Sequence, residues 1–128
     1  MSIPDLNFEL VSDPSASRLG REALTPLEVH LEPETFSDLN LIISELTANA
    51  VKYGPGSPIA VFVGVGAEGL VRGHVDDGGS GGIGITDGDP SNGTGLGLMI
   101  VDTLARAWGV DAGTARVWFE LAPPTRTA

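Results

Sequence analysis

The longest regular pattern in the chain is a run of apolar residues at helical spacing between Thr35 and Tyr53. A Gly-Pro-Gly sequence at 54–56 follows it and cannot continue a helix. The apolar side chains recur every three or four residues, which is the period of an α-helix with a buried face: Phe36, Leu39, Ile43, Leu46, Ala50 and Tyr53. A buried helix of this length must pack against a sheet or other helices, so the chain is expected to form a layered domain.

The segments around this helix predict a sheet and two more helices. Shorter helices are expected at 16–24, after the cap-forming sequence SDPSAS, and at 98–108. Alternating or β-branched residues predict strands at 7–11, 58–65, 70–75 and 115–121, and a short strand at 27–31. This order predicts an α+β two-layer sandwich, with helices on one face of a mixed, mainly antiparallel sheet. With 128 residues, we expect a single domain over 1–128 with its core at about 7–121.

The charge and composition exclude several classes of protein. A net charge of -10 argues against direct nucleic-acid binding, which needs clustered Lys and Arg. The absence of cysteine excludes disulfides, thiolate metal sites and cysteine nucleophiles. The first residues do not form a signal peptide, and no apolar run reaches the roughly 18 residues of a membrane helix. We therefore expect a cytoplasmic protein that does not bind membranes.

The 18 glycines produce motif matches that fail when their context is considered. The stretches 64–69 and 79–84 both fit the GxGxxG dinucleotide pattern, but neither opens a predicted helix. No GxxxxGK[ST] phosphate loop occurs. The stretch that starts DGDPSN at 87 lacks the turn glycine and the final glutamate of a calcium loop. These interpretations are rejected.

The sequence GTGLGL at 93–98 has a more informative position, at the end of a long glycine-rich stretch and at the start of a predicted helix. Glycines there let the backbone approach a ligand, and the N-H groups of a first helical turn attract anions such as phosphate. A simple glycine-rich turn before a helix remains the alternative interpretation.

Acidic and amide side chains occur at two other places where a ligand could be reached. Glu45 and Asn49 are one turn apart on the long helix, which is otherwise largely apolar. A buried carboxylate needs a partner, so the pair is either a ligand site or a satisfied polar pair of the core. Asp76 and Asp77 end a predicted strand and precede glycines, where a carboxylate can reach a ligand or form an ordinary turn.

Taken in order, these motifs resemble the Bergerat-fold ATP-binding superfamily of histidine-kinase catalytic domains, type II topoisomerases, heat-shock chaperones and mismatch-repair ATPases. The three motifs are Glu-x-x-x-Asn-Ala on a helix, Asp-x-Gly-x-Gly after a strand, and Gly-x-Gly-Leu-Gly-Leu opening a helix. The segments ISELTANAVKYG at 43–54 and GTARVWFEL at 113–121 resemble its anti-sigma-factor serine kinase branch. The resemblance covers about 7–121.

The resemblance implies a role for each matching residue. Glu45 matches the general base, Asn49 the residue that binds Mg²⁺, and Lys52 the basic residue near the phosphates. Asp77 matches the aspartate that binds adenine, although Asp76 is an alternative that would place Ser80 at the position of the second glycine.

The rest of the nucleotide site follows from the same resemblance. Gly79 and Gly81 complete the aspartate motif, and 82–92 correspond to a lid over the nucleotide. Arg116 stands where the branch often has a threonine that contacts the nucleotide, so the nearest threonine, Thr114, is the candidate for this contact. The glycines that receive the phosphates correspond to Gly93, Gly95 and Gly97, and the same cofactor-binding segment includes Thr94, Leu96 and Leu98.

The function implied by the resemblance is that of an anti-sigma regulatory factor that uses Mg²⁺ and ATP. It would phosphorylate a serine or threonine of an anti-sigma-factor antagonist and would bind a sigma factor, and a homodimer is left open. Two alternatives remain: an ATP-binding module that sequesters its partner with little catalysis, and a stand-alone histidine-kinase-type ATPase domain. His30 and His74 lie in predicted strand or linker positions and are not expected to accept phosphate.

Overall fold

The computed structural model describes residues 3–79, 95–111 and 113–124, and it describes only the backbone of 95–97. The helices and strands follow one another in this order: β1 (Leu6–Leu10), α1 (Ala16–Ala23), the 3-10 helix η1 (Thr25–His30), α2 (Pro33–Tyr53), β2 (Ile59–Val65), the short 3-10 turn η2 (Ala67–Gly69), β3 (Val71–Asp76), α3 (Gly95–Leu104), β4 (Ala107–Val110) and β5 (Arg116–Leu121). No helix in this described part of the chain is long and apolar enough to span a membrane.

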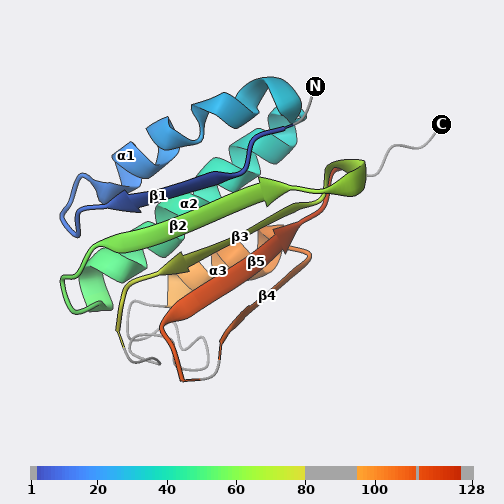
Figure 1. Ribbon diagram of the computed structural model, residues 1–128. Coiled ribbons are helices and arrows are strands. Elements are labelled where there is room, and N and C mark those ends of the chain that lie inside the picture. The colour runs from blue at the N-terminus through green and yellow to red at the C-terminus, as the bar shows by residue number, and fades with distance from the viewer. Residues whose placement is uncertain (1–2, 80–94, 112, 125–128) are drawn as a thin grey trace.

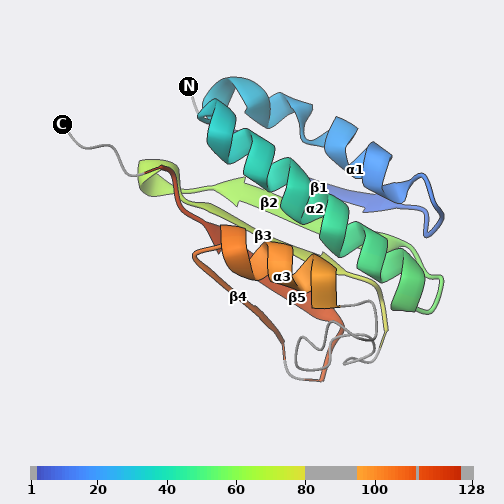
Figure 2. The ribbon, with the colours of Figure 1, turned by 180° about the vertical axis from the view of Figure 1, so that it is seen from behind.

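The strands form a sheet in the order β1-β2-β3-β5-β4, and every neighbouring pair among the described strands is antiparallel. The helices α1, α2 and α3 cover one face of the sheet, and α2 lies between the other two (Figure 1, Figure 2). The prediction of an α+β sandwich with helices on one face is therefore confirmed.

The core lies between the helices and the inner face of the sheet. Alternation along each strand places β-branched and aromatic side chains toward the helices, since successive residues point to opposite faces. The long helix α2 supplies its apolar side chains to the same layer. Fully buried members of this core include Leu39, Ile42, Ile43, Val61, Val63, Val71, Val101 and Phe119.

The outer face of the sheet carries a row of half-buried aromatic rings and ion pairs. Phe62 stacks on His74 with ring centroids 5.4 Å apart, and His74 pairs with Trp118 on β5. Arg72 and Glu120 form an ion pair with an N to O distance of 3.3 Å. Burial lowers the pKa of His74, and the positive charge of Arg116 adds to this effect.

Two predictions from the sequence are wrong. Residues 27–30 belong to η1 rather than to a strand, and Leu31 follows the helix in an extended conformation. In a strand, residues two apart share a face, but Leu27 is fully buried while Val29 is 86% exposed. Pro26 lies in the first turn of this helical segment, where its fixed backbone angle is favourable.

The predicted helix at 98–108 ends earlier, at Leu104, and is followed by the unpredicted strand β4. The backbone N-H of Arg106 donates to the carbonyl oxygen of Glu120 (2.8 Å), and Trp108 pairs with Phe119. Trp108 also donates its indole N-H to Asp102 (2.9 Å), which ties β4 to α3. Pairing with β5 therefore overrides the helical spacing of the sequence.

Gly73 on β3 gives a test of the packing between neighbouring strands of the sheet. A Cβ atom there would lie 2.6 Å from the Phe119 ring and 2.6 Å from the carbonyl oxygen of Phe62. Gly73→Ala is therefore expected to lower the free energy of unfolding by about 1 to 3 kcal/mol, measured in urea. Gly66→Ala is the matched control, because a Cβ there meets nothing closer than 3.7 Å. Equal stability of the two variants would contradict this packing.

Candidate functional site

The helix α2 places Glu45 and Asn49 on the same side, one turn apart, and both side chains are half-buried. The Nδ2 atom of Asn49 is enclosed and has no hydrogen-bond partner among the described residues. Leaving a buried amide unpaired typically costs about 1 to 3 kcal/mol. Such a group fits a position that contacts a bound ligand, because a ligand would supply the partner that the described residues do not.

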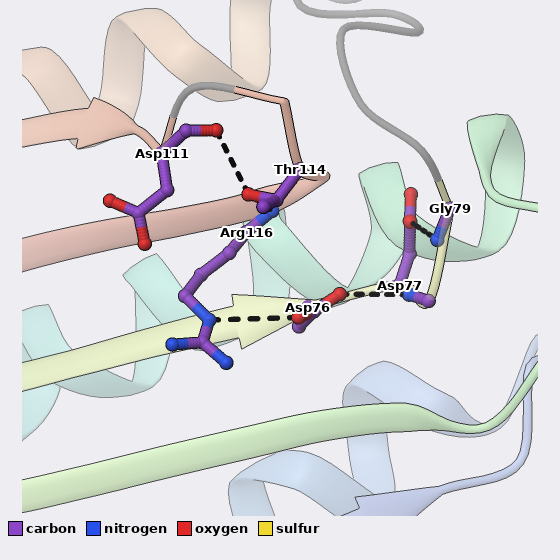
Figure 3. A network of polar contacts seen from close by, with 7 residues as sticks. Asp76, Asp77, Gly79, Asp111, Thr114 and Arg116 are labelled. Atoms are coloured by element: carbon purple, nitrogen blue, oxygen red, sulfur yellow. Dashed lines mark hydrogen bonds and ion pairs between the residues drawn. The ribbon is translucent and has the colours of Figure 1, made fainter.

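The end of β3 separates the two aspartates onto opposite sides of the sheet. Asp76 faces outward, where its Oδ2 lies 3.6 Å from Nε of Arg116, and it accepts a hydrogen bond from the Gly78 N-H (2.9 Å). Asp77 is only 9% exposed and accepts a hydrogen bond from the Gly79 N-H (2.8 Å). Figure 3 shows these two carboxylates with their separate partners.

Two glycines pack closely against Asp77, at positions where a side chain would clash with it. A Cβ at Gly54 would lie 2.9 Å from Cβ and 3.0 Å from Oδ2 of Asp77. A Cβ at Gly79 would lie 3.0 Å from Oδ1 of the same residue. Since Gly54 directly follows α2, the carboxylate of Asp77 lies at the end of the helix that carries Glu45 and Asn49. The structure therefore brings two of the sequence motifs together at one edge of the sandwich.

Lys52 and Thr114 take other positions. Lys52 is exposed, and its Nζ lies 5.1 Å from the centroid of the Tyr53 ring. The Thr114 hydroxyl donates to the Asp111 carbonyl oxygen (2.9 Å) and accepts from the Arg116 N-H (3.1 Å), so it stabilises the turn before β5 (Figure 3). A nucleotide contact by either side chain stays a prediction.

The structure describes only part of the glycine motif GTGLGL at 93–98. The described residues do not include Gly81, the predicted lid at 82–92, Gly93 or Thr94. Gly95, Leu96 and Gly97 form the first turn of α3, where the sequence predicts the start of a helix, and Leu98 is 2% exposed in the core. Any contact between Leu98 and a ligand would therefore involve its backbone.

Two small residues that no sequence pattern singles out shape the surroundings of Asp77. The sequence identifies Gly54 only as the end of a helix, but its lack of a side chain also lets Asp77 pack against the end of α2. The Cβ atom of Ala115 lies 3.8 Å from the position that a Cβ of Gly79 would occupy. Only packing between distant segments reveals these roles, since nothing in the local sequence distinguishes a spacing glycine from a turn glycine.

An apolar groove next to Glu45 is another feature that the sequence does not predict. The groove has a volume of about 640 Å³ and lies between α2 and α3. Its lining residues are Leu41, Glu45, Met99, Ile100, Thr103 and Leu104. The exposed apolar residues Leu41 and Met99 are the available signal, because helical spacing puts each of them on the edge of a buried face.

Comparison with known proteins agrees with the fold and the motifs. The chain resembles the crystal structure of the RsbU and RsbW domains of Rv1364c from Mycobacterium tuberculosis, with a TM-score of 0.70 and 24% sequence identity. The match covers 98% of this chain and 34% of that chain, so the protein spans about a third of the length of the solved structure. No curated protein sequence matches the chain. The family model described as "Histidine kinase-, DNA gyrase B-, and HSP90-like ATPase" matches residues 35–127, which include most of α2, Asp77 and α3. Because this match extends over most of the sequence, the chain belongs to the family of histidine kinase-, DNA gyrase B- and HSP90-like ATPases.

Proposed function

We propose that the protein binds ATP with Mg²⁺ and phosphorylates a serine or threonine of an anti-sigma-factor antagonist. It would also hold a sigma factor inactive by binding it, as a single cytoplasmic domain without direct nucleic-acid contact. Membership of the ATPase family supports the use of ATP. The choice of this branch of the family rests on the sequences at 43–54 and 113–121.

The observation that carries the proposal is the buried Nδ2 atom of Asn49, which has no hydrogen-bond partner among the described residues and lies one turn after Glu45. Rotation of the carboxamide offers either its oxygen, which suits Mg²⁺, or its N-H₂ group, which suits a phosphate oxygen. At the other end of the site, Asp77 can accept a hydrogen bond from the adenine amino group, and its carboxylate is positioned by the Gly79 N-H and by close packing against Gly54. The described residues therefore suit both Mg²⁺ and ATP.

The proposed reaction needs little covalent chemistry from the protein. Bound Mg²⁺ supplies neutralisation of the charge that develops on the phosphate oxygens. The acceptor hydroxyl oxygen bonds to the γ-phosphorus while the bond to the bridging oxygen breaks and ADP leaves with the electron pair. Glu45 takes the hydroxyl proton as general base. The half-buried position of Glu45, at the edge of an open groove, allows a protein hydroxyl to reach it.

The alternatives predict different products. A sequestering module would bind ATP and a sigma factor without labelling an antagonist. A histidine-kinase-type domain would phosphorylate a histidine. Within this chain, His74 stacks on Phe62 in the sheet and His30 is the last residue of η1. Neither histidine is therefore on α2, the helix that carries Glu45.

The test is transfer of radiolabel from γ-labelled ATP to purified candidate antagonists in the presence of Mg²⁺. We expect acid-stable label on serine or threonine, and no label with the Asn49→Ala variant, which lacks the proposed metal ligand. Binding of ATP and a sigma factor without labelling of any antagonist would favour the sequestering function. Acid-labile label on a histidine would favour the histidine-kinase type.

A further inference from the structure

The groove between α2 and α3 combines an apolar floor with the proposed general base. Leu41 is 42% exposed and Met99 is 51% exposed, which makes them two of the few large apolar residues left open to solvent in the described part of the chain. They lie on different helices and line the same groove as Glu45. Apolar surface gathered in a groove marks a site of association more than single exposed residues do.

A row of three carboxylates runs along α2, and its last member, Glu45, lines this groove. The carboxylates are those of Glu34, Asp38 and Glu45. Together with Leu41 they recur at intervals of three or four residues, so they share one side of the helix. Burial raises the pKa of Asp38, and the negative charge of Glu34 raises it further. Among the described residues, none of these three carboxylates forms an ion pair. The row therefore presents unneutralised negative charge next to apolar surface.

From these contacts we infer that the groove docks the acceptor protein through a short segment that combines apolar residues with Lys or Arg. The apolar side chains would cover Leu41 and Met99, and the basic side chains would meet the carboxylate row. Because Glu45 lines the groove and Asn49 lies one turn further along α2, a segment seated there brings its hydroxyl toward the reacting phosphate. This inference rests on the proposed function, since it identifies the chemistry of the acceptor at the same site.

A synthetic peptide of defined sequence tests the groove directly, whichever protein carries the acceptor hydroxyl. The probe is a fluorescein-labelled amphipathic peptide of Leu and Lys with one central Ser, and its comparison is the same peptide with Glu in place of Lys. Fluorescence anisotropy should show saturable binding of the Leu-Lys peptide only. Leu41→Ser and Met99→Ser should each weaken this binding about three- to tenfold, because each removes apolar contact area. Asp38→Asn should weaken peptide binding less than these two substitutions do. Added salt should make the difference between Asp38→Asn and the wild type smaller.

The matched control is Val29→Ser, an equally apolar change at a residue that is 86% exposed on η1, outside the residues that line the groove. Its peptide affinity should equal that of the wild type, and thermal melting should show that all variants remain folded. If Leu41→Ser and Met99→Ser bind the peptide as tightly as Val29→Ser does, the inference is wrong. Equal binding of the Leu-Glu peptide would also overturn it.

The outcome is separable from that of the proposed function. Once an acceptor is labelled, Leu41→Ser should raise its KM about three- to tenfold while kcat and the KM for ATP stay unchanged. If the wild type labels no acceptor, the proposed function fails while the peptide measurement still decides the groove. If labelling occurs but neither the peptide affinity nor the acceptor KM responds to Leu41→Ser, the docking inference fails and the kinase function stands.

Discussion

Replacing Glu45 with Gln is expected to slow phosphoryl transfer by about a hundred- to ten-thousandfold, which is the usual effect of removing a general base. The variant keeps the shape of the side chain and most of its hydrogen-bonding capacity, so ATP affinity should change by less than about threefold. The reason is that the carboxylate acts on the acceptor hydroxyl, while the ligand contacts are assigned to Asn49 and Asp77. Single-turnover labelling of the acceptor, measured beside calorimetric ATP titration, separates the two effects.

The matched control is Glu34→Gln, which removes one negative charge from the same side of α2, three turns before Glu45. Its transfer rate at saturating acceptor should stay close to that of the wild type. If Glu45→Gln transfers phosphate as fast as Glu34→Gln, Glu45 is not the base, and its pairing with Asn49 must have a structural explanation.

Replacing Asp77 with Ala is expected to weaken ATP binding about ten- to a hundredfold. A hydrogen bond to a charged group contributes about 1.5 to 3 kcal/mol, and Asp77 is the carboxylate on the buried side of the sheet edge. Preference for ATP over GTP should fall in the same variant, because guanine has no amino group at the position where adenine donates. Calorimetric titration with both nucleotides measures these changes.

Asp76→Ala is the matched control, one residue away and facing the opposite side. It loses the exposed ion pair with Arg116, which is worth about 0 to 1 kcal/mol of stability, and its ATP affinity should remain near that of the wild type. A larger loss of affinity at Asp76 than at Asp77 would show that the assignment of the two residues is reversed.

The sequence predicts the fold class because its strongest patterns belong to long, well-buried elements. The period of α2 and the alternation of β2, β3 and β5 reflect packing between two layers, and the structure confirms all four elements. Errors occur where local pattern and tertiary pairing disagree. The strand β4 is short and half-buried, and it is set by pairing with β5 rather than by its own composition.

In the candidate site, too, local patterns predict some residues, while others depend on tertiary contacts. Glu45 and Asn49 are recognisable because polar residues one turn apart are unusual on a largely apolar helix. The sequence alone does not separate Asp76 from Asp77, because only the end of β3 shows which carboxylate turns toward α2. Gly54 and the groove beside Glu45 depend on contacts between segments that are distant in the chain, so no local pattern announces them.

The central claim is that Mg²⁺ and ATP bind where α2, Asp77 and the start of α3 meet, and a two-dimensional ¹⁵N-¹H NMR titration tests it most directly. We expect saturable shifts for the Asn49 side-chain amide and for the backbone amides of Gly54, Asp77 and Gly79. The outer-face residues His74 and Trp118 should shift little, since the sheet separates them from the site. Shifts that gather on the outer face, or an Asn49 side chain that does not respond at saturating Mg-ATP, would contradict the account.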